Sequence, residues 1–197
     1  MTTSVDAIHK SSDQINPDQL YVKKKSEFNV NISSDTLESC YISGICILPS
    51  GETIVADYTN KRVKMLDKHY NVSSDLEVGS NPQDICIIST FSQVAISNGT
   101  SSVHFINIID GKLKDFYTIC EFKHVALGIT YHQGDLYIIS GTALYQYTMY
   151  YTVMSTRDWI HKKTLYEDTG GGITGKLCCK YRNCIFHSVN TVYTFDT

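Results

Sequence analysis

The sequence contains no uninterrupted apolar run long enough for a membrane-spanning helix. Its N-terminal region has neither the basic start nor the apolar core of a secretory signal. The formal net charge is −3, so the chain has no global positive field that would hold a polyanion or an anionic membrane surface. These absences favour a soluble protein of the cytoplasm, in which any nucleic-acid contact would need a local basic patch.

Residue patterns for catalysis and metal binding are also missing. No Gly-x-Ser-x-Gly motif occurs, and no Cys–His or Ser–His–Asp set can be defined from spacing alone. Cys179, Cys184 and His187 lie close together in the sequence, but they lack the paired spacing and the fourth ligand of a structural zinc site. We therefore expect no enzyme activity, no metal and no cofactor.

The cysteines give no sign of a disulfide framework. There are seven of them, an odd number, and several lie in apolar runs that resemble strands. A free cysteine in such a run behaves as a small hydrophobic residue. The cysteines therefore indicate unpaired thiols and a reducing compartment.

The stretch Ile42–Asp67 is the part of the chain against which the rest can be compared. It contains three short runs joined by turns, which predict three strands: Ile45–Leu48, Thr53–Ala56 and Arg62–Leu66. In the last run, the apolar residues Val63 and Met65 fall on one face. The basic residues Arg62 and Lys64 fall on the other face, which is typical of a half-buried strand. The two earlier runs are apolar without alternation, as expected for strands covered on both faces.

This pattern recurs along the chain. The run Gly44–Ile47 is echoed at Asp84–Ile87 and at Gly128–Tyr131, with spacings of 40 and 44 residues. Each echo is followed by a turn, a short apolar strand, a polar or glycine-containing loop and another strand. A period of about 40 to 45 residues with four short strands is typical of a β-propeller blade. The sequence thus predicts an all-β, open or partial propeller with about three blades plus an incomplete fourth.

The repeats also predict the boundaries. We expect a flexible lead-in over residues 1–20 and a partial propeller over 21–197, with the following blades: about 42–79, 81–122, 124–171 and an incomplete 172–197. The third blade carries an insertion at about 148–161, expected as a loop on one face. Residues 28, 30 and 32 are apolar at a spacing of two and predict a further strand, with Lys23–Lys25 at its edge. An open array leaves strand edges exposed, so we expect a fragment, a truncated paralogue or association with another copy.

The first repeat resembles a known blade. Its motifs are Gly-Ile-Cys-Ile-Leu-Pro-Ser-Gly from residue 44, Ile-Val-Ala-Asp at 54–57 and Asn-Lys-Arg-Val at 60–63. They resemble the NHL-repeat blade of tripartite-motif (TRIM) proteins, in particular the TRIM-like proteins predicted from molluscs and other marine invertebrates. The similarity covers roughly residues 26–147 and 164–171. It implies that Asp57 and Asn60 cap the loop between the second and third strands, and that Arg62 pairs with Asp57 across it.

The resemblance also implies a function. Full-length relatives carry a RING finger, B-box zinc modules and a coiled coil ahead of the propeller, which selects the ubiquitylation target. The first 40 residues here contain neither the paired Cys–His spacings of zinc modules nor heptad repeats. The resemblance therefore implies a non-catalytic protein–protein interaction module, whose partner is a protein or a ubiquitylation target.

Two binding hypotheses remain. In the first, the face that bears the loops between the second and third strands binds a protein, through the following candidate residues: Tyr58, Thr59, Asn60, Lys61, Asn98 and Gly99. In the second, the same face binds single-stranded RNA, because Lys61, Arg62 and Lys64 place charge beside the Tyr58 ring. The second and third repeats add little positive charge and the chain is acidic overall, which favours the protein partner.

Overall fold

The computed structural model describes residues 27–88, 92–141, 143–151, 157–167, 177–180, 183–187 and 192–196. Within these ranges the secondary structure consists of β-strands, turns and bends. No helix in the described part of the chain is long and apolar enough to cross a membrane. The prediction of an all-β fold is confirmed.

The strands form four antiparallel sheets in sequence order. The first sheet contains β1 (Ile42–Ile47), β2 (Thr53–Asp57), β3 (Arg62–Leu66) and β4 (Val72–Glu77). The second contains β5 (Asp84–Ile88), β6 (Gln93–Ser97), β7 (Ser102–Ile109) and β8 (Lys112–Glu121). The third contains β9 (Gly128–His132), β10 (Asp135–Ser140), β11 (Ala143–Tyr151) and β12 (Arg157–Glu167). The fourth contains β13 (Leu177–Lys180), β14 (Asn183–His187) and β15 (Val192–Asp196).

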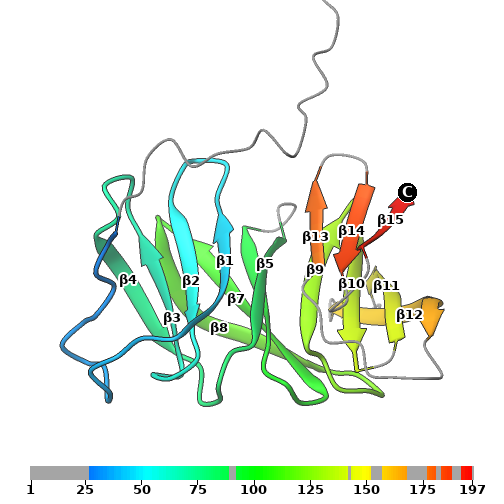
Figure 1. The fold of residues 1–197 in the computed structure, drawn as a ribbon, viewed down its shortest axis with the longest axis horizontal. Coiled ribbons are helices and arrows are strands. Elements are labelled where there is room, and N and C mark those ends of the chain that lie inside the picture. Colours follow the sequence, from blue (N-terminus) through cyan, green and yellow to red (C-terminus); the bar gives the residue numbers. More distant parts are fainter. Residues whose placement is uncertain are drawn as a thin grey trace, which may run out of the picture.

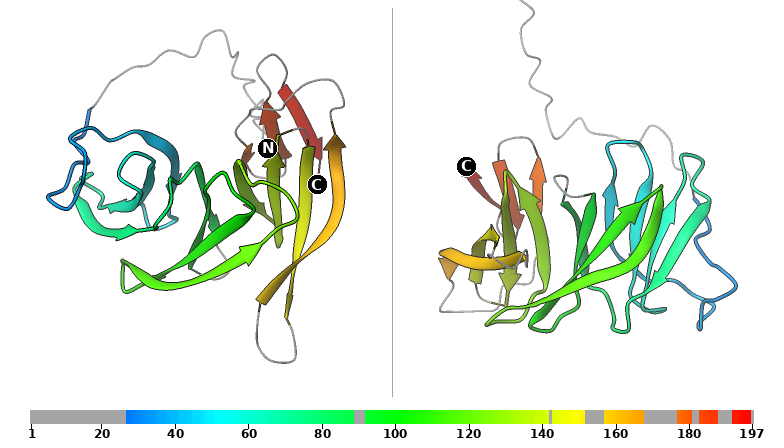
Figure 2. Two further views of the ribbon diagram at one scale, coloured as in Figure 1. Left: turned by 90° about the horizontal axis from the view of Figure 1, so that it is seen from below. Right: turned by 180° about the vertical axis from the view of Figure 1, so that it is seen from behind.

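The sheets are arranged as propeller blades. Each sheet keeps its strands in chain order, so that β1, β5, β9 and β13 are the first strands of successive sheets. These first strands lie side by side, and the sheets fan out from them (Figures 1 and 2). The described sheets do not close into a ring, so the fold is an open β-propeller of three four-stranded blades and a three-stranded fourth. The predicted number of blades is confirmed.

The apolar runs form two cores, one on each side of the second sheet. In β6, Val94 and Ile96 pack against the first sheet, while Ala95 between them packs against the third. Successive side chains of a strand point to opposite faces, and both faces of β6 are covered. A sheet between two others therefore needs continuous apolar runs, which explains why β6 does not alternate with polar residues.

Polar residues join the neighbouring sheets near their first strands. The Ser43 hydroxyl donates to the Pro82 carbonyl at 2.6 Å, and the Ser97 hydroxyl donates to the Leu127 carbonyl at 2.7 Å. The first bond links the first sheet to the chain that enters the second, and the other links the second sheet to the chain that enters the third. The buried carboxylate of Asp84 accepts from the Ile129 amide at 3.1 Å and so ties β5 to β9.

The expected strand over residues 28–32 is wrong. This segment has no regular structure, because its polar side chains bind nearby backbone groups instead of a neighbouring strand. The Ile32 amide donates to the Asp35 carboxylate at 3.0 Å, and the Asn31 amide donates to the Asn29 side chain at 2.9 Å. The expected lead-in over residues 1–20 and the lysines at 23–25 lie outside the described residues.

The insertion in the third blade also differs from its expectation as a loop. Its described residues continue the strands, so that β11 extends to Tyr151 and β12 begins at Arg157. Met149 pairs with Trp159 and Tyr151 pairs with Arg157. The residues at 149–151 and 157–161 are rich in aromatic and β-branched types, which favour pairing over a loop. Residues 152–156 lie outside the description.

Gly44 allows the first two sheets to approach closely. A Cβ atom at this position would lie 3.0 Å from the Ile85 amide nitrogen and 3.1 Å from an Asp84 carboxylate oxygen. We expect Gly44→Ala to lower the free energy of unfolding by about 1–3 kcal/mol, as overpacking does elsewhere. Chemical denaturation measures the change. Ile45→Ala is the control, because this neighbouring side chain is 62% exposed and its truncation should change stability little. Equal stability of Gly44→Ala and the wild type would contradict the expectation.

Candidate functional site

The loop residues predicted to bind a partner lie at one end of the sheets. Tyr58, Thr59, Asn60 and Lys61 form the turn between β2 and β3, whereas Asn98 and Gly99 follow β6. The connection from β4 to β5 joins the two loops. Its Asn81 amide group donates to the Tyr58 carbonyl at 2.8 Å, and its Ser80 hydroxyl accepts from Asn98 at 3.0 Å. The two loops therefore belong to one hydrogen-bonded surface.

Within the first loop, Asp57 and Asn60 bond to each other. The Asn60 backbone amide donates to Asp57 Oδ1 at 3.3 Å, and its side-chain amide donates to Asp57 Oδ2 at 2.9 Å. Asn60 also accepts from the Leu37 amide at 2.9 Å. Asn60 is only 4% exposed, so its side chain is used inside the protein and is not offered to a partner. Lys61 is exposed and has a positive φ of 54°.

The pair between Arg62 and Asp57 that the NHL resemblance implied is not formed. Arg62 bonds to Asp75 on β4 and lies 3.7 Å from the Glu77 carboxylate. Lys64 forms the ion pair with Asp57 that was expected for Arg62: its ammonium lies 2.8 Å from Asp57 Oδ2. Asp57 faces Arg62 directly in the register of β2 and β3, yet the flexible Arg62 side chain turns toward the outer strand, where Asp75 and Glu77 offer carboxylates.

Lys64 is a fully buried cation. Its ammonium donates to Asp35 Oδ2 at 2.7 Å, to Asp57 Oδ2 at 2.8 Å and to Cys40 Sγ at 3.3 Å. The side chain points away from the second sheet, as the alternation of β3 predicted. No local pattern indicates that residues 35–40 cover this face, since the contact joins segments more than 20 residues apart. Residues 27–41, dark blue in Figure 1, run along this outer side of the first sheet.

The charges of this cluster hold one another ionised. Burial alone would lower the pKa of Lys64, but its bonds to Asp35 and Asp57 outweigh burial and the pKa is raised. Burial alone would raise the pKa of Asp57, but bonds from Cys40, Lys64 and Asn60 hold that pKa at about 2. Asp35, Cys40 and Asp57 place ligand atoms within 4.8 Å of one another, a set that could hold a metal ion. The ammonium of Lys64 already contacts all three.

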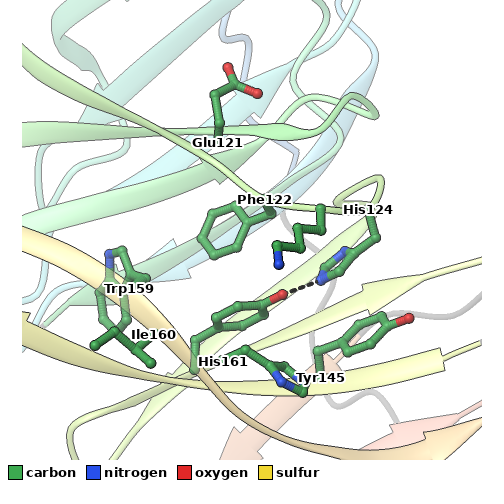
Figure 3. A pocket seen from close by; sticks show the side chains of 9 residues that line it. Glu121, Phe122, His124, Tyr145, Trp159, Ile160 and His161 are labelled. Carbon is green, nitrogen blue, oxygen red and sulfur yellow. Dashed lines mark hydrogen bonds between the residues drawn. The ribbon is translucent and has the colours of Figure 1, made fainter.

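A pocket lies between the outer strands of the second and third sheets (Figure 3). Its volume is about 440 Å³. Three segments line it: Glu121–His124 at the end of β8 and beyond, Tyr145 and Tyr147 on β11, and Trp159–His161 on β12. Three aromatic side chains form the floor: Phe122, Tyr147 and Trp159. Each is less than 10% exposed and belongs to the core between the two sheets.

His124 is held in one orientation at the side of this pocket. Its ring stacks on Tyr145 with centroids 3.9 Å apart. Its Nδ1 lies 3.1 Å from the Val125 carbonyl, which can only accept, so Nδ1 carries the proton. Nε2 therefore accepts the Tyr147 hydroxyl at 2.6 Å (Figure 3). Burial lowers the pKa of His124 and raises the pKa of Tyr147 to about 12, so both groups are neutral at pH 7.

Sequence reasoning missed this pocket. The signal lies in the spacing: Tyr145 and Tyr147 are two residues apart on β11, and Trp159 and His161 are two residues apart on β12. Residues at this spacing share one face of a strand. Tyr147 pairs directly with His161, which places both sets on the same face of the sheet. Only the pairing of the two strands brings the sets together, and the sequence did not show that pairing.

Comparison with solved structures gives the fold a wider context. The chain is similar to hydrazine synthase of Kuenenia stuttgartiensis (TM-score 0.59, 12% identity), covering 84% of this chain and 49% of that chain. It is also similar to U3-55K (TM-score 0.59, 10% identity), covering 81% of this chain and 50% of that chain. A third similar structure is BBS1N in complex with ARL6DN (TM-score 0.54, 14% identity), with 87% of this chain and 53% of that chain covered. These are β-propeller folds, and the chain spans about half the length of each. No protein-family model and no curated protein matches the sequence.

The buried lysine gives a direct test of the first site. We expect Lys64→Met to lower the free energy of unfolding by about 3–5 kcal/mol, because Asp35 and Asp57 would remain buried without their cation. The pKa of Asp57 is lowered from 3.8 to about 2, so the stability from this group is present above pH 3.8 and lost as the pH falls toward 2. Urea denaturation across this range should show a smaller acid-induced loss in the variant.

Lys68→Met is the matched control, because Lys68 is exposed and forms no ion pair in the described residues. It should leave both the stability and its pH dependence close to those of the wild type. An unchanged acid-induced loss in Lys64→Met would contradict the role of Lys64 in ionising Asp57.

The hydrogen bond between Tyr147 and His124 gives a second test. We expect Tyr147→Phe to lower the free energy of unfolding by about 1 kcal/mol and to raise the pKa of His124, because neutral Nε2 loses its donor. Titration of the His124 ring by NMR measures the shift. Tyr145→Phe is the control, since no bond to the Tyr145 hydroxyl is found in the described residues and the stacked ring is kept. Equal titration curves in the two variants would refute the assignment.

Proposed function

We propose that this protein is a non-catalytic interaction module that binds another protein. The observation that carries the proposal is the neutralisation of its cations near the loop face. Of the three basic residues that would support RNA binding, Lys64 is fully buried between two carboxylates. Arg62 is only 14% exposed and lies against Asp75 and Glu77. Only Lys61 remains available to a phosphate backbone, which binds through several cations at once.

The scaffold supports this proposal. The loops after β2 and β6 are tied to each other by side-chain bonds through Ser80 and Asn81. The Gly99 amide donates to the Ala126 carbonyl at 3.1 Å, which joins the second loop to the chain entering the third sheet. Loops held in this way present a surface with little loss of conformational entropy on binding.

The state of the thiols supports a function without catalysis. Burial raises the pKa of Cys40 and Cys120 to about 11 and that of Cys46 to about 12. Burial also raises the pKa of Cys86 well above its ordinary value. A cysteine acts as a nucleophile through its thiolate, and these four thiols are protonated at neutral pH.

A narrower form of the proposal follows from the first repeat. Its motifs at 44–51, 54–57 and 60–63 resemble an NHL blade, so the partner would be a ubiquitylation target and the chain would be the target-recognition part of a longer TRIM-type ligase. Single-stranded RNA is the alternative partner, and the exposed Lys61 beside Tyr58 is what favours it.

Binding measurements distinguish the two partners. The probes are a display library of protein fragments and a pool of random single-stranded RNA, each tested from low to physiological salt. We expect fragments that bind at micromolar or tighter affinity, and no RNA binding at low salt. RNA binding that falls steeply with salt and is weakened by Lys61→Glu, but not by the control Lys68→Glu, would overturn the protein proposal.

A further inference from the structure

We infer that the pocket between β8 and β12 binds an extended peptide segment that carries an apolar side chain next to a carboxylate. This inference rests on the proposed function and names the kind of protein segment and the place where it binds. The place differs from the loop face that the sequence indicated, because it lies between the outer strands of the second and third sheets.

The pocket lies at the edge of β12 and beside the end of β8. In the described sheets, β8 is the last strand of the second sheet and β12 is the outer strand of the third. Trp159, Ile160 and His161 are consecutive on β12, and all three line the pocket. Consecutive residues point to opposite faces, so a pocket that touches all three reaches around the edge of the strand. The Trp159 amide already donates to the Asp158 carboxylate at 2.8 Å. An extended peptide would therefore add a strand by pairing with the remaining outward N–H and C=O groups of this edge.

The floor of the pocket is apolar, and its rim carries an exposed apolar side chain. Phe122, Tyr147 and Trp159 form an apolar base, and Phe122 meets Tyr147 edge-on with centroids 4.7 Å apart. At the rim, Ile160 is 51% exposed although it is a large apolar side chain. A volume of about 440 Å³ falls within the range of small-ligand pockets and is large enough for one bulky side chain. These features fit an apolar anchor, the kind of residue that dominates binding energy in protein interfaces.

Two residues of opposite charge, Glu121 and Lys123, line the pocket. Glu121 at one end of the pocket already accepts a hydrogen bond from the Ser101 hydroxyl at 2.8 Å. Lys123 at the other side is exposed and forms no ion pair within the described ranges. A hydroxyl donor leaves the charge of Glu121 in place, so Lys123 is the group with which a ligand carboxylate would pair, on the side of the pocket away from Glu121.

The preformed state of the pocket adds specificity. His124 is fixed by its bonds to Val125 and Tyr147 and by its stacking on Tyr145. Both of its nitrogens are used, so it forms part of the wall and leaves Lys123 as the cation that meets the ligand. A wall that does not rearrange on binding avoids the cost of ordering side chains.

The experiment uses the whole chain and a phage-displayed library of random 12-residue peptides. We expect enriched peptides to share an aromatic or large aliphatic residue next to Asp or Glu. Synthetic copies should bind at least tenfold more weakly to Ile160→Lys and to Lys123→Glu. The matched controls are Ile109→Lys and Lys112→Glu, which make the same changes at exposed residues of the second sheet away from the pocket. Both controls should bind as the wild type does.

A second selection tests the charge argument independently of folding. Lys123→Glu panned against the same library should lose the preference for acidic residues and enrich Lys or Arg next to the apolar anchor. A misfolded variant could not produce such a switch. An unchanged preference for acidic peptides would overturn the role of Lys123.

The possible failures have different meanings. Peptides that bind equally to Ile160→Lys and Ile109→Lys would overturn the pocket inference while protein binding stands. A library without binders, when displayed protein fragments still bind, would also overturn the pocket inference alone. Binding of random RNA with no binding of peptides or protein fragments would overturn the proposed function together with this inference.

Discussion

Each of the first three sheets has an apolar face that only another layer can cover, and the remaining features follow from this constraint. The second sheet shows it fully, because Val94 and Ile96 pack on one neighbour while Ala95 packs on the other. The close approach of the first two sheets at Gly44 and the Asp84 bond to the third sheet bring the first strands together. A single sheet of this kind would expose one core face to water, so stability requires neighbours.

Among the described sheets, the first has a neighbour on one side only, and residues 27–41 cover part of its other side. This cover is polar where it meets β3, because Lys64 lies between Asp35 and Asp57. A buried ion pair is a specific contact more than a strongly stabilising one, since the cost of removing the charges from water offsets much of the attraction. The cover is incomplete at β1, where Ile45 is 62% and Ile47 is 65% exposed.

The same charges influence what the surface can bind. Near the loop after β2, Lys64 holds the cover and Arg62 holds the outer strand, so neither is available to a polyanion. Near the pocket the situation is reversed: Lys123 lies beside aromatic side chains that are already packed into the core. Lys123 therefore places one positive charge next to an apolar floor at a strand edge, with Glu121 at the other end of the pocket. That combination suits a peptide more than a nucleic acid, whose backbone requires many cations along a track.

The sequence by itself determined the class of fold and the number of blades. The repeated apolar run at Ile45, Ile85 and Ile129 carries this information, because strand period and turn chemistry are local properties of the chain. Tertiary structure decided the rest. It buried Lys64, turned Arg62 away from Asp57 and assembled the pocket from β8, β11 and β12. These outcomes depend on contacts between segments distant in sequence, and the alternation of a strand shows which face a side chain occupies but not what covers that face.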